Sequence, residues 1–309
     1  MSNLRELSRR IDSIESTRQI TRTMEMVSTA RVGEALQRAS DAAPYKDAIK
    51  RMLSAVASSD PRAADQPLLQ NHKTEEGVLF ILIASDRGLA GGFNITLQRS
   101  VERRLRELRA KGKRAEVITC GTKPTDYFRY RGIAPALSFT GISAEPTHDE
   151  AMQVASYVID GYTAGTFDRV EICYNHARNR VQQDVVDEQL LPVADEDRQI
   201  DMTMPAAPRT KTSVERVEAK EYTEFRFDPS PAKVLGYLMP AYIQTVIFHA
   251  LLDSAAAEHG ARRRAMKAAT DNANEAITTL NRSYNRIRQG SITTELNEII
   301  GGASALEDN

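Results

Sequence analysis

The sequence of 309 residues contains no tryptophan and only two cysteines, Cys120 and Cys173. Both cysteines lie in β-like runs, "VITC" and "EICYN", which indicates buried thiols rather than a disulfide or a metal site. The five histidines lack a metal-ligand spacing such as H-x-x-x-H, and no G-x-S-x-G nucleophile motif occurs. We therefore expect a protein of a reducing compartment, with no metal, no cofactor and no catalytic centre of its own.

Long apolar runs and a dominant charge are also missing. No stretch approaches the roughly 18 apolar residues that span a bilayer, and "MSNLRELSRRIDSIE" carries charges where a signal peptide needs an apolar segment. The 41 basic and 42 acidic residues nearly cancel, so no global field attracts nucleic acid or an anionic membrane. We expect an intracellular protein that reaches a membrane only through partners.

The first segment has no proline before Pro44, and its apolar residues follow a helical spacing. The steps alternate between three and four, as in a coiled coil, and then continue with a shift of one residue. The residues are Leu4, Leu7, Ile11 and Ile14, followed by Ile20, Met24 and Val27. This pattern predicts a long helix in residues 1–58, which resumes after Pro44 and ends at "SSDPRAADQP".

Residues 77–193 alternate between strand-like and helix-like patterns. "GVLFILIASD" is a continuous apolar run typical of a strand covered on both faces, and "NITLQRSVERRLRELRAKGK" indicates the helix after it. The strands "AEVITCG" and "DRVEICYN" repeat this order with two further helices, and "VQQDVVDEQLLPV" indicates an antiparallel or edge strand. The alternation predicts a Rossmann-like domain with a mainly parallel sheet.

The polar, proline-interrupted stretch at 194–230 predicts an exposed linker. Within residues 231–309 the sequence is helical again from Pro231 as far as Gly290. Its seam residues recur at steps of three and four and are mostly small: Met266, Ala269, Ala273, Ala276, Leu280, Ser283 and Ile287. Small seam residues let two helices approach closely, so we expect this helix to pair with the N-terminal one.

The predicted fold class is therefore α/β. It combines a long antiparallel two-helix coiled coil, formed by the N- and C-terminal helices, with the inserted Rossmann-like sheet domain.

"SDRGLAGGFN" follows the first predicted strand, where α/β folds place phosphate loops. It lacks the lysine of a P-loop and does not match G-x-G-x-x-G in the required phase. We favour a structural turn, in which Gly88, Gly91 and Gly92 supply positive φ or close backbone approach. Asn94 would cap the next helix. Lys123 also follows a strand, and we interpret it as a surface lysine.

Two features of the C-terminal helix point to partners. The cluster of Arg262, Arg263, Arg264 and Lys267 is either a solvated face or a docking site for an acidic partner, since arginine forks suit carboxylates. Nucleic acid fits less well, because no aromatic residues are interleaved with these charges. The closing "SITTELNEIIGGASALEDN" carries an apolar stripe at helical spacing, and something must cover it.

Three stretches resemble the γ subunits of bacterial F-type ATP synthases. They are "RQITRTMEMVSTAR", "SDRGLAGGFN" and "RRRAMKAATDNANEAITTLNRSYNRIRQGSITTELNEIIGGASA". The last stretch fits the family signature in the spacing of Ile292, Thr293, Glu295, Glu298, Gly302 and Ala303. The resemblance covers most of the chain and is strongest at its two ends.

The resemblance implies a non-catalytic rotor subunit. In the family, the coiled coil stands inside a ring of three α and three β subunits, while the sheet domain binds the ε subunit and the membrane ring of c subunits. Ion flow turns the ring and the stalk together, and the stalk drives the β subunits through their catalytic states. The implied location is the cytoplasmic face of the bacterial plasma membrane, with no nucleic-acid partner and no direct small-molecule ligand.

The resemblance also assigns partner contacts, residue by residue. Met24 and Arg262 match family positions near the β-subunit loops that the stalk pushes. The polar contacts around the upper stalk are matched by Gln289, Thr293, Glu295 and Glu298. The apolar sleeve of the ring would surround Ile292, Leu296 and Ile299.

Some residues depart from the family pattern. Gly33 and Glu34 stand where the family usually keeps a basic run after its methionine motif, and Ala90 stands where a cysteine is common. The stretch at 194–222 lacks the cysteine pair of the chloroplast thiol switch, so we expect no regulation of that type.

Two other function classes compete with the rotor. One is an α/β nucleotide-binding enzyme whose long helices form a dimerisation arm, and it predicts nucleotide binding by the chain alone. The other is a coiled-coil scaffold or nucleic-acid adaptor, and it predicts salt-sensitive binding to duplex DNA.

Overall fold

The computed structural model describes residues 2–59, 66–72, 74–193, 228 and 230–307. The chain divides into two compact units, residues 1–30 with 262–309 and residues 31–261, which we call the coiled-coil unit and the sheet unit. Both divisions fall inside long helices, α1 (Ser2–Ser59) and α6 (Pro231–Glu307). The predicted linker at 194–230 lies almost entirely outside the described residues.

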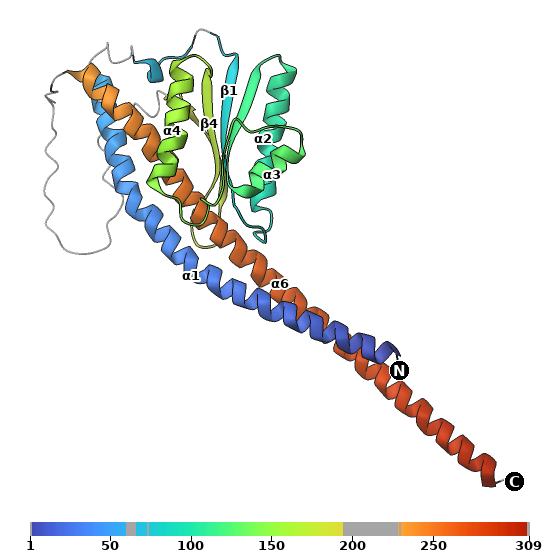
Figure 1. Cartoon of the computed structure of the whole chain (residues 1–309). Coiled ribbons are helices and arrows are strands. Elements are labelled where there is room, and N and C mark those ends of the chain that lie inside the picture. The colour runs from blue at the N-terminus through green and yellow to red at the C-terminus, as the bar shows by residue number, and fades with distance from the viewer. Residues whose placement is uncertain (1, 60–65, 73, 194–227, 229, 308–309) are drawn as a thin grey trace, which may run out of the picture. The chain divides into compact units, whose positions relative to one another are not determined.

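The sheet unit contains a five-stranded sheet of order β3-β2-β1-β4-β5 (Figure 1). The strands are β1 (Gly77–Ile83), β2 (Arg114–Cys120), β3 (Leu137–Phe139), β4 (Arg169–His176) and β5 (Asp184–Leu191). The first four are parallel, and β5 pairs antiparallel with β4 at the sheet edge. The predicted α/β class and the antiparallel edge strand are confirmed, whereas the three-residue β3 was not predicted.

Helices cover both faces of this sheet. Alternate side chains of β1 go to opposite faces, so Val78, Phe80 and Leu82 form one core with α2 (Phe93–Ala110) and α3 (Thr122–Tyr130). Leu79, Ile81 and Ile83 form the other core with α4 (His148–Thr163). This second core also takes in the first part of α6, the last part of α1 and the short 3-10 helix η2 (Pro67–Leu69). Coverage on both faces explains why the β1 sequence is apolar throughout.

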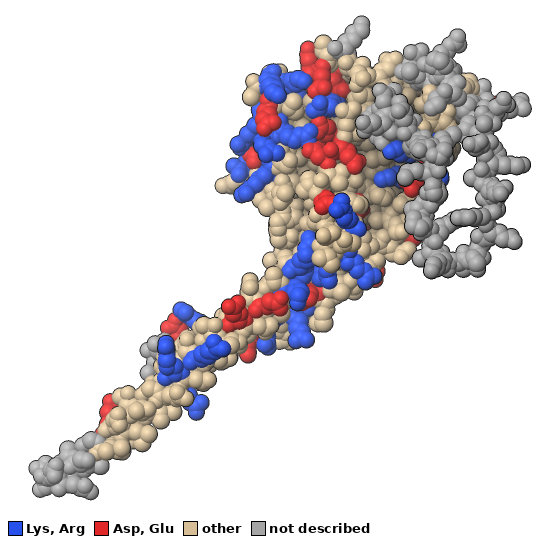
Figure 2. All heavy atoms as spheres, turned by 180° about the vertical axis from the view of Figure 1, so that it is seen from behind, with Lys and Arg blue, Asp and Glu red and all other residues tan. Residues whose placement is uncertain are grey.

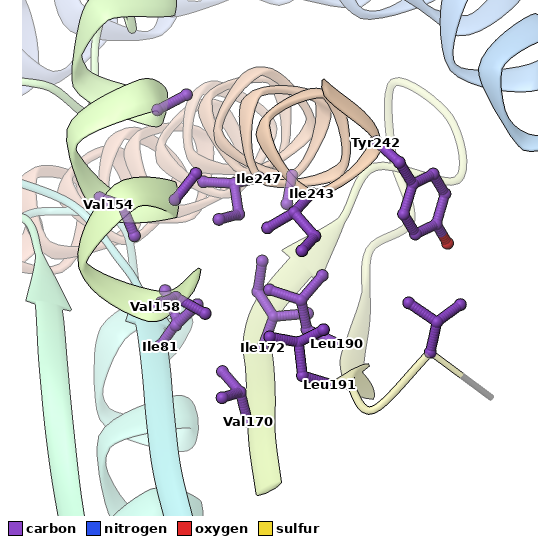
Figure 3. Close-up of a cluster of buried hydrophobic side chains, with 14 of the residues drawn as sticks. Ile81, Val154, Val158, Val170, Ile172, Leu190, Leu191, Tyr242, Ile243 and Ile247 are labelled. Carbon is purple, nitrogen blue, oxygen red and sulfur yellow. The ribbon is translucent and has the colours of Figure 1, made fainter. Parts of the chain in front are cut away.

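The first part of α6 is a core helix. Figure 3 shows its Ile243 and Ile247 facing a cluster that includes Ile172 of β4 and Val158 of α4. By length and composition, α6 is also the one helix in the described part of the chain that is apolar enough to cross a membrane, which the sequence analysis did not predict. Its contacts with the sheet account for that apolar composition.

The coiled-coil unit pairs α1 and α6 in antiparallel fashion. The buried hydroxyls of Thr21 and Thr270 lie 2.8 Å apart, and one turn earlier in α1 the Arg18 Nη1 donates to Asn274 Oδ1 at 3.5 Å. Residue numbers therefore rise along α1 while they fall along the facing stretch of α6, as in an antiparallel pair. On α6 the predicted seam is confirmed, because each of its members is buried or half-buried: Met266, Ala269, Ala273, Ala276, Leu280, Ser283 and Ile287.

On α1 the predicted shift of the seam is wrong. Ile20 and Val27 are 58% and 52% exposed, whereas Thr21 and Ser28 are buried. The three-four alternation that begins at Leu4 continues without a shift, through Arg18, Thr21 and Ser28. The prediction followed the apolar residues Ile20 and Val27, which lie beside the seam. The seam itself buries the small polar side chains of Thr21 and Ser28.

Both long helices run through residues that were expected to interrupt or end them. Pro44 lies inside α1, and Gly290 lies inside α6, which continues to Glu307. Pro44 is exposed, so the carbonyl that loses its backbone donor can bind water. Gly290 costs helix propensity without forcing an end.

A larger side chain should overpack the seam at Ala273 more than at Ala276. A leucine at Ala273, which is 8% exposed, should cost about 1–3 kcal/mol of unfolding free energy. Ala276 lines an open groove of about 630 Å³ with Ile14 and Leu280, so Ala276→Leu should cost less or stabilise. Chemical denaturation of the full chain would measure both variants. Unchanged stability in Ala273→Leu would argue against the pairing of α1 with α6.

His249 should make the sheet unit less stable in acid. Burial and the charge of Lys46 lower its pKa to about 4, although Asp253 and Asp47 act in the opposite direction; His176 adds a smaller lowering effect. A lowered histidine pKa means that the unfolded chain binds the proton more tightly. The stability contribution is therefore complete above about pH 6.5 and is lost as the pH falls towards about 4.

In His249→Gln, we expect the free energy of unfolding to fall less as the pH is lowered. The expected difference is about 1 kcal/mol, because the His249 ring is partly exposed. Unfolding curves of the two proteins between about pH 7.5 and pH 4 would measure it. The comparison at the upper pH is the control for effects of the substitution on packing. Parallel pH profiles would contradict the assignment.

Candidate partner interface

The "SDRGLAGGFN" loop is held by Asp86 at the carboxyl edge of the sheet. Asp86 Oδ1 accepts hydrogen bonds of 2.8 Å from the Thr122 and Gly141 backbone N–H groups and from the Thr122 hydroxyl. Its Oδ2 accepts from the Ser143 N–H at 2.9 Å. Burial opposes the charged form, but these bonds outweigh it and lower the pKa of Asp86. One carboxylate therefore ties together the segments that follow β1, β2 and β3.

Only part of the predicted turn chemistry is present in this loop. Gly91 has a φ of 60°, as expected, but Leu89 also has a positive φ of 63°. An added Cβ at Gly88 or Gly92 meets nothing closer than 3.6 Å, so neither glycine is needed for a close approach. The predicted capping role of Asn94 is wrong: its Oδ1 accepts from the Ser85 N–H at 3.0 Å and joins the loop to the end of β1.

The loop packs against helices of its own unit. Ala90 and Phe93 are buried with Ala256, Ala257 and Ala261 of α6. Small side chains on both sides allow the loop and the helix to approach closely. Lys123 is exposed, as predicted for a surface lysine. The loop is therefore held in place by Asp86 and by the contacts of Ala90 and Phe93 with α6, while Arg87, Leu89, Gly91 and Gly92 are exposed.

The two cysteines are buried in the sheet as free thiols, as predicted. Burial raises the pKa of Cys120 to about 12 and that of Cys173 well above its usual value. Thiols held in this protonated state are poor nucleophiles. Across the described ranges, no three His, Cys, Asp or Glu side chains come together as a possible metal site.

The strongest surface feature is the last part of α6 in the coiled-coil unit. Ile292, Leu296, Ile299 and Ile300 recur along one side of the helix and are between 45% and 69% exposed. The antiparallel pairing described above brings the start of α1 opposite the residues just before Gly290, so this part of α6 extends beyond its partner helix. An apolar stripe in water is a surface for another protein.

The polar residues assigned to the same interface surround this stripe. Gln289, Thr293, Glu295 and Glu298 are all exposed. The Thr293 hydroxyl donates to the Gln289 backbone carbonyl at 2.9 Å. The structure thus brings seven of the nine assigned residues together on one helical segment.

The other two assigned residues, Met24 and Arg262, are only partly available. Met24 is half-buried, and Arg262 is 7% exposed with interactions inside the protein. Within the arginine cluster, Lys267 forms an ion pair with Asp271 at 3.6 Å, and burial beside Arg263 lowers the pKa of Arg264. The cluster is therefore partly buried and partly paired, and it matches neither the fully solvated face nor a free cationic docking site.

Sequence patterns missed a second exposed apolar surface, on α1. Ile20, Met26 and Val27 are 52–59% exposed, and Ile20 and Val27 lie two turns apart on the same side of the helix, with Met24 between them. Ile20, Met24 and Val27 were predicted to be seam residues because they are apolar and periodic, whereas Met26 was not. The signal that could have separated them from the seam is the unbroken alternation from Leu4 to Ser28.

Comparisons with known proteins agree with these features. The family model described as ATP synthase matches residues 3–306. The ATP synthase gamma chain of Pelotomaculum thermopropionicum is 39% identical over 307 residues, covering 99% of this chain and 100% of the relative. That of Nocardioides sp. is 37% identical over 311 residues, covering 99% and 97%.

Solved structures show the same fold. A chain of the Euglena gracilis mitochondrial ATP synthase, in a structure of OSCP/F1/c-ring, matches with a TM-score of 0.63 at 18% identity, covering 99% of this chain and 95% of that one. A chain of the Tetrahymena thermophila central stalk/c-ring structure matches with a TM-score of 0.58 at 22% identity, covering 81% and 99%. From the family model and the relatives, the chain belongs to the ATP synthase gamma-chain family.

Proposed function

We propose that this chain is the central-stalk rotor subunit of an F-type ATP synthase, which couples ion flow through a membrane ring to the conformational cycle of catalytic β subunits. The observation that carries the proposal is the exposed apolar stripe of Ile292, Leu296 and Ile299 on a helix that extends beyond its partner. In a chain of this family, the cover for that stripe is the sleeve formed by the α and β subunits.

The same proposal assigns the remaining partners. The α3β3 ring would contact Met24, Arg262 and the polar residues around the stripe, of which Glu295 and Glu298 suit donors in the ring. The ε subunit and the c-subunit ring would bind the sheet unit and place the complex on the cytoplasmic face of the bacterial plasma membrane. Catalysis would belong to the β subunits, and the chain itself would supply no catalytic residue.

A rotor has to transmit torque without unwinding. The seam of the coiled-coil unit consists largely of small residues, with Ala273 buried and the Thr21–Thr270 pair inside it. Close packing of this kind resists sliding better than exposed ion pairs, which contribute a few tenths of a kcal/mol each. A membrane potential supplies about 2.3 kcal/mol per charge per 100 mV, so the work of several ions must be added before one ATP forms. A stiff or modestly elastic stalk can store the work of successive ions until one ATP forms.

The competing enzyme hypothesis loses its main support from the loop after β1. That loop was the candidate phosphate site, but its Asp86 binds the segments after β2 and β3, and its Ala90 packs against alanines of α6. The enzyme hypothesis predicts that the purified chain binds ATP by itself, whereas a rotor should not bind it tightly. Equilibrium dialysis with ATP separates the two.

Co-expression with the α and β subunits of the same genome tests the proposal directly. We expect a stable complex with ATPase activity that depends on this chain, because the ring should cover the apolar stripe. Size-exclusion chromatography and an ATPase assay would measure it. Failure to assemble with well-folded α and β subunits would overturn the proposal.

Removal of the end of α6 gives a sharper test of the stripe. Truncation after Gly290, or substitution of Ile292, Leu296 and Ile299 together by serine, should weaken assembly or coupling. Because residues 292–300 are exposed, the unfolding curve of the isolated chain should change little. The measurements are ATP-driven proton pumping per ATP hydrolysed and the thermal unfolding of the chain.

The matched control keeps the helix and changes the polar positions Thr294 and Asn297 to alanine, since neither is an assigned contact. If the control variant loses coupling as strongly as the serine variant, the effect belongs to helix stability and the stripe has no special role.

A further inference from the structure

A basic groove lies on the outer side of the sheet unit, between α2 and α3. It has a volume of about 340 Å³ and is lined by four arginines and three other residues: Arg99, Arg103, Arg106 and Arg131, together with Glu102, Glu107 and Tyr127. Figure 2 shows basic side chains on the sheet unit, with acidic side chains interleaved among them. The lining residues come from both helices, so the groove exists only in the folded unit.

Glu102 organises this groove from below. Its side chain is only 8% exposed, and a carboxylate buried to that extent needs partners. Its Oε2 accepts from the Tyr127 hydroxyl at 2.6 Å, and its Oε1 accepts from Arg106 Nη2 at 2.5 Å, with Arg131 Nε 3.8 Å away. The Arg131 guanidinium also lies over the Tyr127 ring, 5.5 Å from its centre. Glu102 thus holds two of the arginines beside the groove before any ligand arrives.

The remaining two arginines keep donors available. Arg103 approaches only Glu107, at 4.0 Å, and both side chains are largely exposed, so that pair is weak. Arg99 forms no hydrogen bond or ion pair with the part of the chain that the structure describes. With four arginines against Glu102 and Glu107, the lining carries two more positive charges than negative ones.

We propose that this groove binds a small phosphate-type dianion or polyanion, such as pyrophosphate. Arginine forks match phosphate oxygens in pairs, and two preoriented guanidinium groups reduce the ordering cost of binding. The volume lies at the lower end of small-molecule sites, and the one aromatic ring in the lining is already stacked on Arg131. The site therefore suits the phosphate groups alone, without a nucleoside.

This site does not use the apolar stripe of α6 that carries the rotor proposal, and a ligand there would depart from the expectation of no direct small-molecule ligand. The negative charge of a bound anion would reduce the repulsion among the four arginines, so the anion should also stabilise the sheet unit.

Isothermal titration of the purified full chain with sodium pyrophosphate, at low ionic strength, tests the proposal. We expect saturable binding with a dissociation constant of about a millimolar or tighter. Arg99→Gln and Arg103→Gln should each weaken binding about tenfold, since each removes a charged donor while the contacts of Glu102 stay intact.

The matched control is Arg129→Gln, because Arg129 is an exposed arginine of α3 outside the groove lining and loses the same charge. It should leave the affinity nearly unchanged. Absence of saturable binding would overturn the proposal, as would an equal loss in all three variants, which would show a general charge effect. Thermal unfolding with and without pyrophosphate gives a second readout, and no upward shift of the transition at saturation would also overturn it.

Discussion

The packing of α6 against one face of the sheet is the contact on which the rest of the structure depends. Ile243 and Ile247 meet Ile81 and Ile172 there, and without this helix α4 would cover only part of that face of the parallel sheet. The same helix continues without a break into the coiled-coil unit and beyond its partner. Its composition follows its surroundings: bulky and apolar on the sheet, small along α1, and an apolar stripe between carboxylates at the end.

The periodicity of the sequence was enough to predict the fold class, because each pattern reports a local environment. The continuous apolar run of β1 reports two covered faces, and the alanine seam of α6 reports a close helix partner. It could not locate the seam on α1, where Thr21 and Ser28 are buried and the larger Ile20 and Val27 are not. The facing helix decides which residues are buried there. Its small side chains let the two helices approach closely, so hydroxyls fit between them and larger branched apolar groups do not.

The candidate interface shows a similar limit. The apolar stripe at the end of α6 follows from the helical spacing of its residues alone. The role of Asn94 did not follow, because its partner Ser85 is nine residues away along the chain and the pairing depends on how the loop returns to β1. The basic groove was equally hidden: Arg99 and Arg103 look like an ordinary solvated helix face until α3 brings Arg131 and Tyr127 beside them.

The buried threonines of the coiled-coil unit have one more consequence. The Thr21 hydroxyl also reaches the Arg18 carbonyl at 3.0 Å, and the Thr270 hydroxyl reaches the Met266 carbonyl at 2.9 Å, so two protons serve three contacts. A slip of either helix by one residue would separate the two hydroxyls, which lie 2.8 Å apart. A seam made mostly of small residues would allow several registers of the two helices, and the threonine pair selects one of them.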